Sequence, residues 1–157
     1  MIVALILQSA IVQPLPQDVW ASVSVGASLA HTSETIEFLR AGFSAVDGEV
    51  TLRRTFRRLN DPPEVSWATS LTCHGVLEAV DRLKIIPAPD VVKPGDTEEI
   101  VLDGEMYAVR FRGRYGSNTG EPVRFSSTGG TPLSKWVSGT LSTLKPCWSP
   151  TRLKVSG

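Results

Sequence analysis

The chain has 157 residues, enough for one domain with its own core, or one domain with a tail. Hydrophobic residues make up 41% of it and charged residues 20%, so the composition excludes a disordered chain. The 16 basic and 16 acidic residues balance, which excludes electrostatic attraction of the molecule as a whole to nucleic acid or to an anionic membrane. Any electrostatic role must therefore be local.

The N-terminal residues 1–12 are almost entirely apolar. This run is shorter than the roughly 20 residues needed to span a bilayer, but it fits the apolar core of a secretory signal. We therefore expect residues 1–17 to be a signal or N-terminal apolar segment, with Ala10 and Ala21 as candidate cleavage sites, and residues 18–157 to form a single α+β domain. The alternative is that the run is a buried first strand. No transmembrane segment is expected.

Alternating apolar and polar residues predict several strands of a half-buried sheet. Residues 35–40 fit either a strand or a short helix, and we favour a strand. Asp47-Gly48 and Asp103-Gly104 are typical of two-residue hairpin turns, so they predict antiparallel hairpins at 41–57 and 99–115. The other expected strands lie at residues 19–25, 64–68 and 123–128.

Two segments have the apolar spacing of amphipathic helices, near residues 73–84 and 132–145. Thr72 is the expected cap of the first helix, and Thr131 of the second. Proline suits the first position of the second helix at Pro132. The expected buried stripes are Cys73, Val76, Leu77, Val80 and Leu83 in the first helix and Leu133, Trp136, Val137, Leu141 and Leu144 in the second.

Cys73 and Cys147 are the only cysteines, and each lies beside the apolar stripe of one predicted helix. A bridge between them is the simplest inference. Cysteines in the cytosol could both stay reduced, but the apolar N-terminus favours an oxidising compartment. We therefore predict a disulfide and a periplasmic or secreted location.

Arginines are the sharpest polar feature of the predicted strands. If the two hairpins lie side by side, their guanidinium groups form one basic face suited to phosphate, sulfate or carboxylate groups. The alternative is the solvated side of an antiparallel sheet, interleaved with Glu64, Glu105 and Glu121. A nucleic-acid partner is not expected, because Tyr107 and Phe111 fall on the opposite face. The candidate binding residues are Arg53, Arg57, Arg110, Arg112, Arg114 and Arg124.

Catalytic motifs are sparse. His31 and His74 are the only histidines, so any scheme using a serine or cysteine nucleophile with a histidine base would need one of them. Adjacent helical residues such as Cys73 and His74 project about 100° apart, which suits neither mutual activation nor chelation of one metal. There is no glycine-rich phosphate loop. We therefore assign no catalytic residue, metal or cofactor, and a small hydrolase using His74 remains the alternative.

The segment DGEMYAVRFRGRYG, followed by TGGTPLSKWVSGTLSTLKPCW, resembles small secreted or periplasmic proteins of Gram-negative bacteria. These share a cysteine at a helix start, an Asp-Gly hairpin and a closing Pro-Cys-Trp. The resemblance covers roughly residues 64–148. Those proteins have no assigned activity, so the resemblance supports export and the disulfide only.

Together these patterns predict an α+β fold, with a mostly antiparallel, twisted sheet of about six strands and two amphipathic helices on its apolar face. For function we expect a non-enzymatic extracytoplasmic module that binds a partner protein or an anionic ligand through the arginine face. The alternatives are the hydrolase and a purely structural envelope protein.

Overall fold

A computed structural model describes residues 15–39, 49–91, 93, 95, 104–113 and 120–152. These residues form a strand meander, a helix, two further strands and a closing helix. Short 3-10 turns extend both helices, at Leu83–Ile85 and Lys145–Cys147. The strands are β1 (Val19–Ala27), β2 (Thr32–Leu39), β3 (Thr51–Arg58), β4 (Glu64–Thr69), β5 (Glu105–Gly113) and β6 (Glu121–Thr128), and the helices are α1 (Gly75–Arg82) and α2 (Pro132–Leu144).

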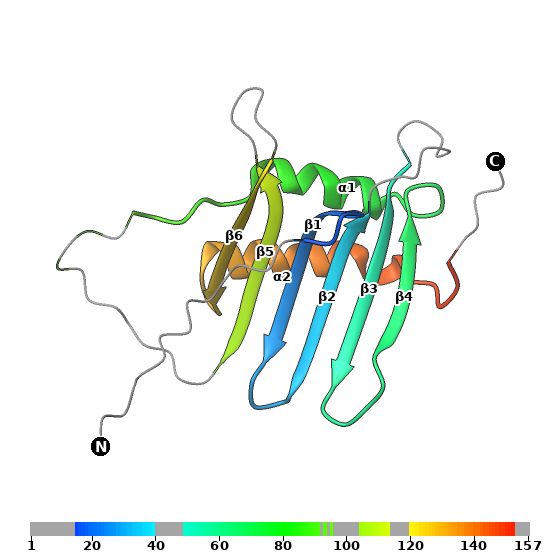
Figure 1. The fold of residues 1–157 in the computed structure, drawn as a ribbon, viewed down its shortest axis with the longest axis horizontal. Helices are drawn as coiled ribbons and strands as arrows, with labels where there is room; N and C mark the ends of the chain where they lie inside the picture. The colour runs from blue at the N-terminus through cyan, green and yellow to red at the C-terminus, as the bar shows by residue number, and fades with distance from the viewer. Residues whose placement is uncertain are drawn as a thin grey trace, which may run out of the picture.

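The six strands form one antiparallel sheet in the order β4-β3-β2-β1-β5-β6. In Figure 1 α2 crosses behind the strands and α1 lies at their upper ends. Both helices pack into one core on the same face of the sheet, and no helix of the described chain covers the other face. The predicted α+β class is confirmed. So is the strand at residues 35–40, which lies mostly within β2.

The core lies between the sheet and the two helices. Alternation brings many apolar side chains of the strands to the helix-bearing face, where residues such as Ile36, Phe38 and Val109 are fully buried. Val76 of α1 and Val137 of α2 are buried against them. This helix-bearing face is therefore the apolar face that the alternation predicted.

The helices begin in different ways. Thr131 caps α2 as predicted, because its hydroxyl accepts a hydrogen bond from the Ser134 amide at 3.1 Å. The prediction that Thr72 caps α1 is wrong: α1 begins after His74, and the Thr72 hydroxyl donates to the Thr69 carbonyl instead. Leu77 was also misplaced, since it is exposed while Ala79 is buried.

The predicted disulfide joins Cys73, just before α1, to Cys147, just after α2, with their Cα atoms 5.5 Å apart. After Cys147 the chain meets the outer edge of β4, where Trp67 and Ser149 exchange two backbone hydrogen bonds of 2.8 and 2.9 Å. The bridge therefore ties both helices and the final segment to the same edge of the sheet.

The two predicted hairpins have different outcomes. β3 does pair with an antiparallel strand before it, but that strand is β2, and residues 40–48 with their Asp-Gly turn lie outside the described residues. The second prediction is wrong for β5, because β1 and β6 occupy both of its edges and leave none for a partner at 99–102. Residues 99–103 themselves lie outside the described residues.

The N-terminal end of the described chain packs on the helix-free face. Leu15 is buried with Val19 and Leu39, and Trp67 packs against them. Ala21, one of the expected cleavage sites, is fully buried in β1, so cleavage there would remove Val19 from the sheet. That site is therefore incompatible with the fold. Within the described ranges, no helix is long and apolar enough to span a membrane.

Candidate functional site

The helix-free side of the sheet carries many of the polar side chains of the strands, and we call it the open face. Its central row crosses all six strands without a break. In this row each residue lies directly opposite the next one on the neighbouring strand. From β6 to β4 the row reads Arg124, Arg110, Ser22, Glu37, Arg53 and Trp67.

The candidate arginines on this face form two separate groups, because β1 and β2 lie between β3 and β5. Three strand spacings of about 4.8 Å separate the backbones of Arg53 and Arg110 by roughly 14 Å. The two predicted hairpins therefore do not lie side by side, and the arginines do not form one continuous basic face. Arg57 is exposed and lies four residues after Arg53 on the same strand, and the structure does not describe Arg114.

Arg53 already has a carboxylate partner. Its Nε donates to Glu37 Oε2 at 2.6 Å, across the β2–β3 pair. This hydrogen bond is the main reason why the pKa of Arg53 is raised. Because the pair neutralises its own charge, Arg53 contributes less to the attraction of an anion than an isolated arginine would.

Arg110 and Arg124 face each other directly in the β5–β6 pair. Like charges opposite each other repel, and an anion placed between them would relieve that repulsion. Arg124 is exposed and makes no ion pair with any residue that the structure describes. Arg124 is therefore available to an anionic group at this end of the open face.

A shallow hollow of about 230 Å³ lies on the open face beside Arg124. Its lining includes several hydroxyl groups from β1, β2 and β6, and we call it the hydroxyl hollow. A larger hollow of about 450 Å³ continues around the edge of β6, between residues 87–90 and the start of α2. Arg124 lines both of them. The hydroxyl residues of the first hollow are Ser24, Ser33, Thr35 and Ser126.

This geometry offers hydrogen-bond donors to an anionic group. Two guanidinium groups and nearby hydroxyls can bind the oxygens of a phosphate, sulfate or carboxylate group. Neither His31 nor His74 lines these hollows. In the described part of the chain, no three His, Cys, Asp or Glu residues are grouped so that they could hold a metal ion.

No family model, curated protein or solved structure matches this chain.

Arg112 has a different role from its neighbours. Its Nη2 donates to the Leu15 carbonyl at 3.1 Å, so it fixes the segment before β1 onto the open face. A binding role for Arg112 would have to use its remaining N–H groups, since the guanidinium carries five.

The position of His74 does not have the geometry that a general base needs. Its side chain is 81% exposed, and its nearest carboxylate is Glu78 Oε1, 3.6 Å away on the next turn of α1. A base needs a positioned substrate proton within hydrogen-bond reach, which a solvated side chain on an outer helix surface does not provide. The hydrolase alternative gains no support from this position.

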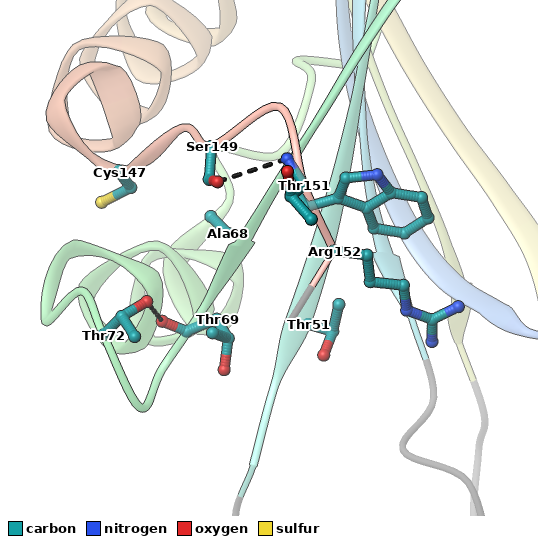
Figure 2. Close-up of a pocket in the computed structure, with 9 residues that line it drawn as sticks. Thr51, Ala68, Thr69, Thr72, Cys147, Ser149, Thr151 and Arg152 are labelled. Carbon is teal, nitrogen blue, oxygen red and sulfur yellow. Dashed lines mark hydrogen bonds between the residues drawn. The ribbon is translucent and has the colours of Figure 1, made fainter. Parts of the chain in front are cut away.

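A small cavity beside the disulfide, drawn in Figure 2, is lined by residues of β4 and of the chain after Cys147. Its volume is only about 20 Å³, close to that of one water. Ser149 Oγ accepts a hydrogen bond from the Thr151 amide at 3.3 Å, so some polar groups that line the cavity are hydrogen-bonded to each other. This cavity belongs to the packing of the final segment and is too small for a ligand.

The alternative interpretation of the arginine face placed Glu64, Glu105 and Glu121 among the arginines. The strand register instead puts these three residues on the helix-bearing side. Glu105, for example, accepts a hydrogen bond from the hydroxyl of Tyr107. The carboxylate that does lie among the arginines is Glu37 of β2. The polar residues at 33, 35 and 37 alternate along the sequence, and this is the pattern that indicates Glu37 on the open face.

Proposed function

We propose that this protein is a non-enzymatic, extracytoplasmic binding module for ligands that carry phosphate, sulfate or carboxylate groups, free or displayed by a partner protein. The β5–β6 end of the open face is the binding surface. The observation that carries the proposal is the direct pairing of Arg110 with Arg124 beside the hydroxyl hollow.

The two neighbouring guanidinium groups provide the charge. Each can give parallel N–H groups to the oxygens of one anion, which is the geometry that favours arginine over lysine at such sites. The hydroxyl hollow provides additional donors next to Arg124, from side chains small enough to leave room for the ligand. Recognition therefore combines charge with hydrogen bonds, and we expect it to weaken as salt increases.

The disulfide supports the extracytoplasmic part of the proposal. Disulfides persist in oxidising compartments and are rare in the cytosol. The apolar residues 1–12 and the resemblance to small secreted proteins point the same way. The periplasm and the extracellular medium are both oxidising, so the disulfide would persist in either compartment.

Two double variants of equal charge test the proposal. Arg110→Ser with Arg124→Ser removes two positive charges from the proposed site, whereas Arg53→Ser with Arg57→Ser removes two from the other end of the same face. We expect the first pair to elute from a sulfated-polysaccharide column at clearly lower salt than the wild type, and the second pair to shift much less. Thermal melting of both controls for folding, since exposed charges contribute little to stability.

Equal shifts for the two double variants would show that only net charge matters, and would refute the proposed site. Competition of the column-bound wild type with inorganic phosphate, inorganic sulfate and poly-glutamate then ranks the three anion chemistries. Poly-glutamate as the best competitor would assign the surface to acidic partner proteins, and phosphate or sulfate would assign it to free or glycan-borne anions. Failure of all three to compete at low salt would also contradict the proposal.

A further inference from the structure

A further hollow of about 460 Å³ lies on the helix-bearing side of the sheet, opposite the open face. Figure 1 shows β2 and β3 continuing past α2 toward the turns that follow β1 and β3, and this hollow lies where they pass the end of that helix. Its volume falls in the range of small-molecule sites. The residues that line it are Glu34, Arg54, Leu141, Ser142, Lys145 and Trp148.

Flat groups are stacked along one wall of this hollow. The guanidinium of Arg54 lies 5.8 Å from the ring centre of Trp148 and 5.6 Å from that of Phe56. The guanidinium of Arg58 lies 5.1 Å from the centre of the same Phe56 ring. At these distances a guanidinium cation and an aromatic ring attract each other. Trp148 and Arg54 are therefore held in place before any ligand arrives, which lowers the entropic cost of binding.

The hollow also has an excess of positive charge. Arg54 Nε donates to Glu34 Oε1 at 2.6 Å, and no described residue accepts a hydrogen bond from its two terminal nitrogens. Lys145 follows the last residue of α2, is exposed, and has no ion-pair partner in the part of the chain that the structure describes. Two cations thus share the hollow with one carboxylate.

We propose that this hollow is a ligand site for small anions with a flat apolar body. The apolar body lies against the Trp148 ring and Leu141, and the anionic group faces Lys145 and the terminal nitrogens of Arg54. Ser142 adds a hydroxyl to the same wall. The site is separate from the proposed function, because it lies on the other face of the sheet and uses none of the same residues.

The fluorescent probe anilinonaphthalene sulfonate has this chemistry, and its neutral analogue phenylnaphthylamine lacks only the anionic group. We expect the wild type to bind the sulfonate more tightly than the neutral analogue. Lys145→Gln should weaken sulfonate binding by up to about fivefold, the effect of losing one exposed charge pair. Lys135→Gln is the matched control, because Lys135 is an exposed lysine in the first turn of the same helix and does not line the hollow.

Glu34→Gln should have the opposite effect and strengthen sulfonate binding, since it removes the carboxylate that competes for Arg54. Melting curves of each variant exclude probe binding to unfolded chains. Equal losses in the two lysine variants, or equal affinity for the charged and neutral probes, would overturn the site. Weaker binding after Glu34→Gln, with the fold intact, would overturn the role given to Arg54.

Discussion

Arg82 of α1 and Trp136 of α2 each donate a hydrogen bond to the other's backbone carbonyl. Arg82 Nη2 reaches the Trp136 carbonyl at 3.1 Å, and Trp136 Nε1 reaches the Arg82 carbonyl at 3.2 Å. The last carbonyls of a helix have no partner within it, so the indole satisfies one such group at the end of α1. Arg82 Nε also donates to the Thr140 hydroxyl at 3.0 Å. The two helices are therefore joined by polar contacts as well as by their apolar stripes.

Replacing Arg82 with methionine should destabilise the fold by about 2–3 kcal/mol, because hydrogen bonds from a charged donor contribute more than neutral ones. Methionine keeps much of the side-chain length but cannot donate to the Trp136 carbonyl or the Thr140 hydroxyl. Urea unfolding measures the change. Arg57→Met, at an exposed arginine of β3, should change stability by less than about 0.5 kcal/mol, and equal losses in both variants would contradict the role of Arg82.

The disulfide should provide a large part of the stability. Cys73 and Cys147 are separated by 74 positions, and closing a loop of that length stabilises a fold by about 4–5 kcal/mol in the chain-entropy model. Reduction should therefore lower the melting temperature strongly. Protein from an oxidising compartment should show no alkylatable thiol by mass spectrometry. Two alkylated cysteines in that sample would argue against both the bridge and export.

Gly75 is required by the close approach of α1 to the end of α2. A Cβ atom at this position would lie 2.7 Å from the Thr143 carbonyl oxygen and 3.2 Å from the Cys147 sulfur. Gly75→Ala should cost about 1–3 kcal/mol, the usual range for overpacking, even though alanine favours helices. Gly129→Ala is the control, because a Cβ there meets nothing within 4 Å. A neutral Gly75→Ala in thermal melting would mean that the helices can move apart freely.

Tyr107 should make the stability depend on pH in the alkaline range. Its hydroxyl donates to Glu105, and this hydrogen bond, followed by burial, raises the pKa of Tyr107 above its ordinary value of 10.0, although a hydrogen bond with Ser138 opposes the shift. Below that value both the folded and unfolded states keep the proton, so the stabilisation is complete. Above it the unfolded state loses its proton first, and stability falls as the pH rises toward the folded pKa.

The melting temperature of the wild type should therefore fall more steeply than that of Tyr107→Phe as the pH rises from about 9 to 11. The variant removes the titrating hydroxyl and leaves Tyr115 as the only tyrosine. Identical slopes for the two proteins would show that Tyr107 does not carry the effect.

Much of the local structure follows from the sequence alone, because it depends on residues near one another. Alternation in β5 predicts that Tyr107 and Val109 face the core and Arg110 faces away, and the pleat of a strand enforces this. Thr131 followed by Pro132 similarly predicts the start of α2, because a cap and its amides are only three residues apart. The disulfide was predictable because the sequence contains only two cysteines, so neither has another cysteine to pair with within the chain.

Strand order was decided by the tertiary structure. Alternation fixes which side chains of a strand share a face, but it does not say which strand lies alongside, since ladder hydrogen bonds come from the backbone and are nearly the same for every sequence. β5 pairs with β1, which separates Arg110 and Arg124 from Arg53, and β2 pairs with β3, which places Glu37 opposite Arg53. The tertiary structure also brings together Arg54 and Trp148, which are distant in the sequence. The Arg54 guanidinium lies 5.8 Å from the centre of the Trp148 ring, beside the hollow on the helix-bearing face. Such contacts depend on how buried apolar surfaces fit together across the whole chain, which no local pattern contains.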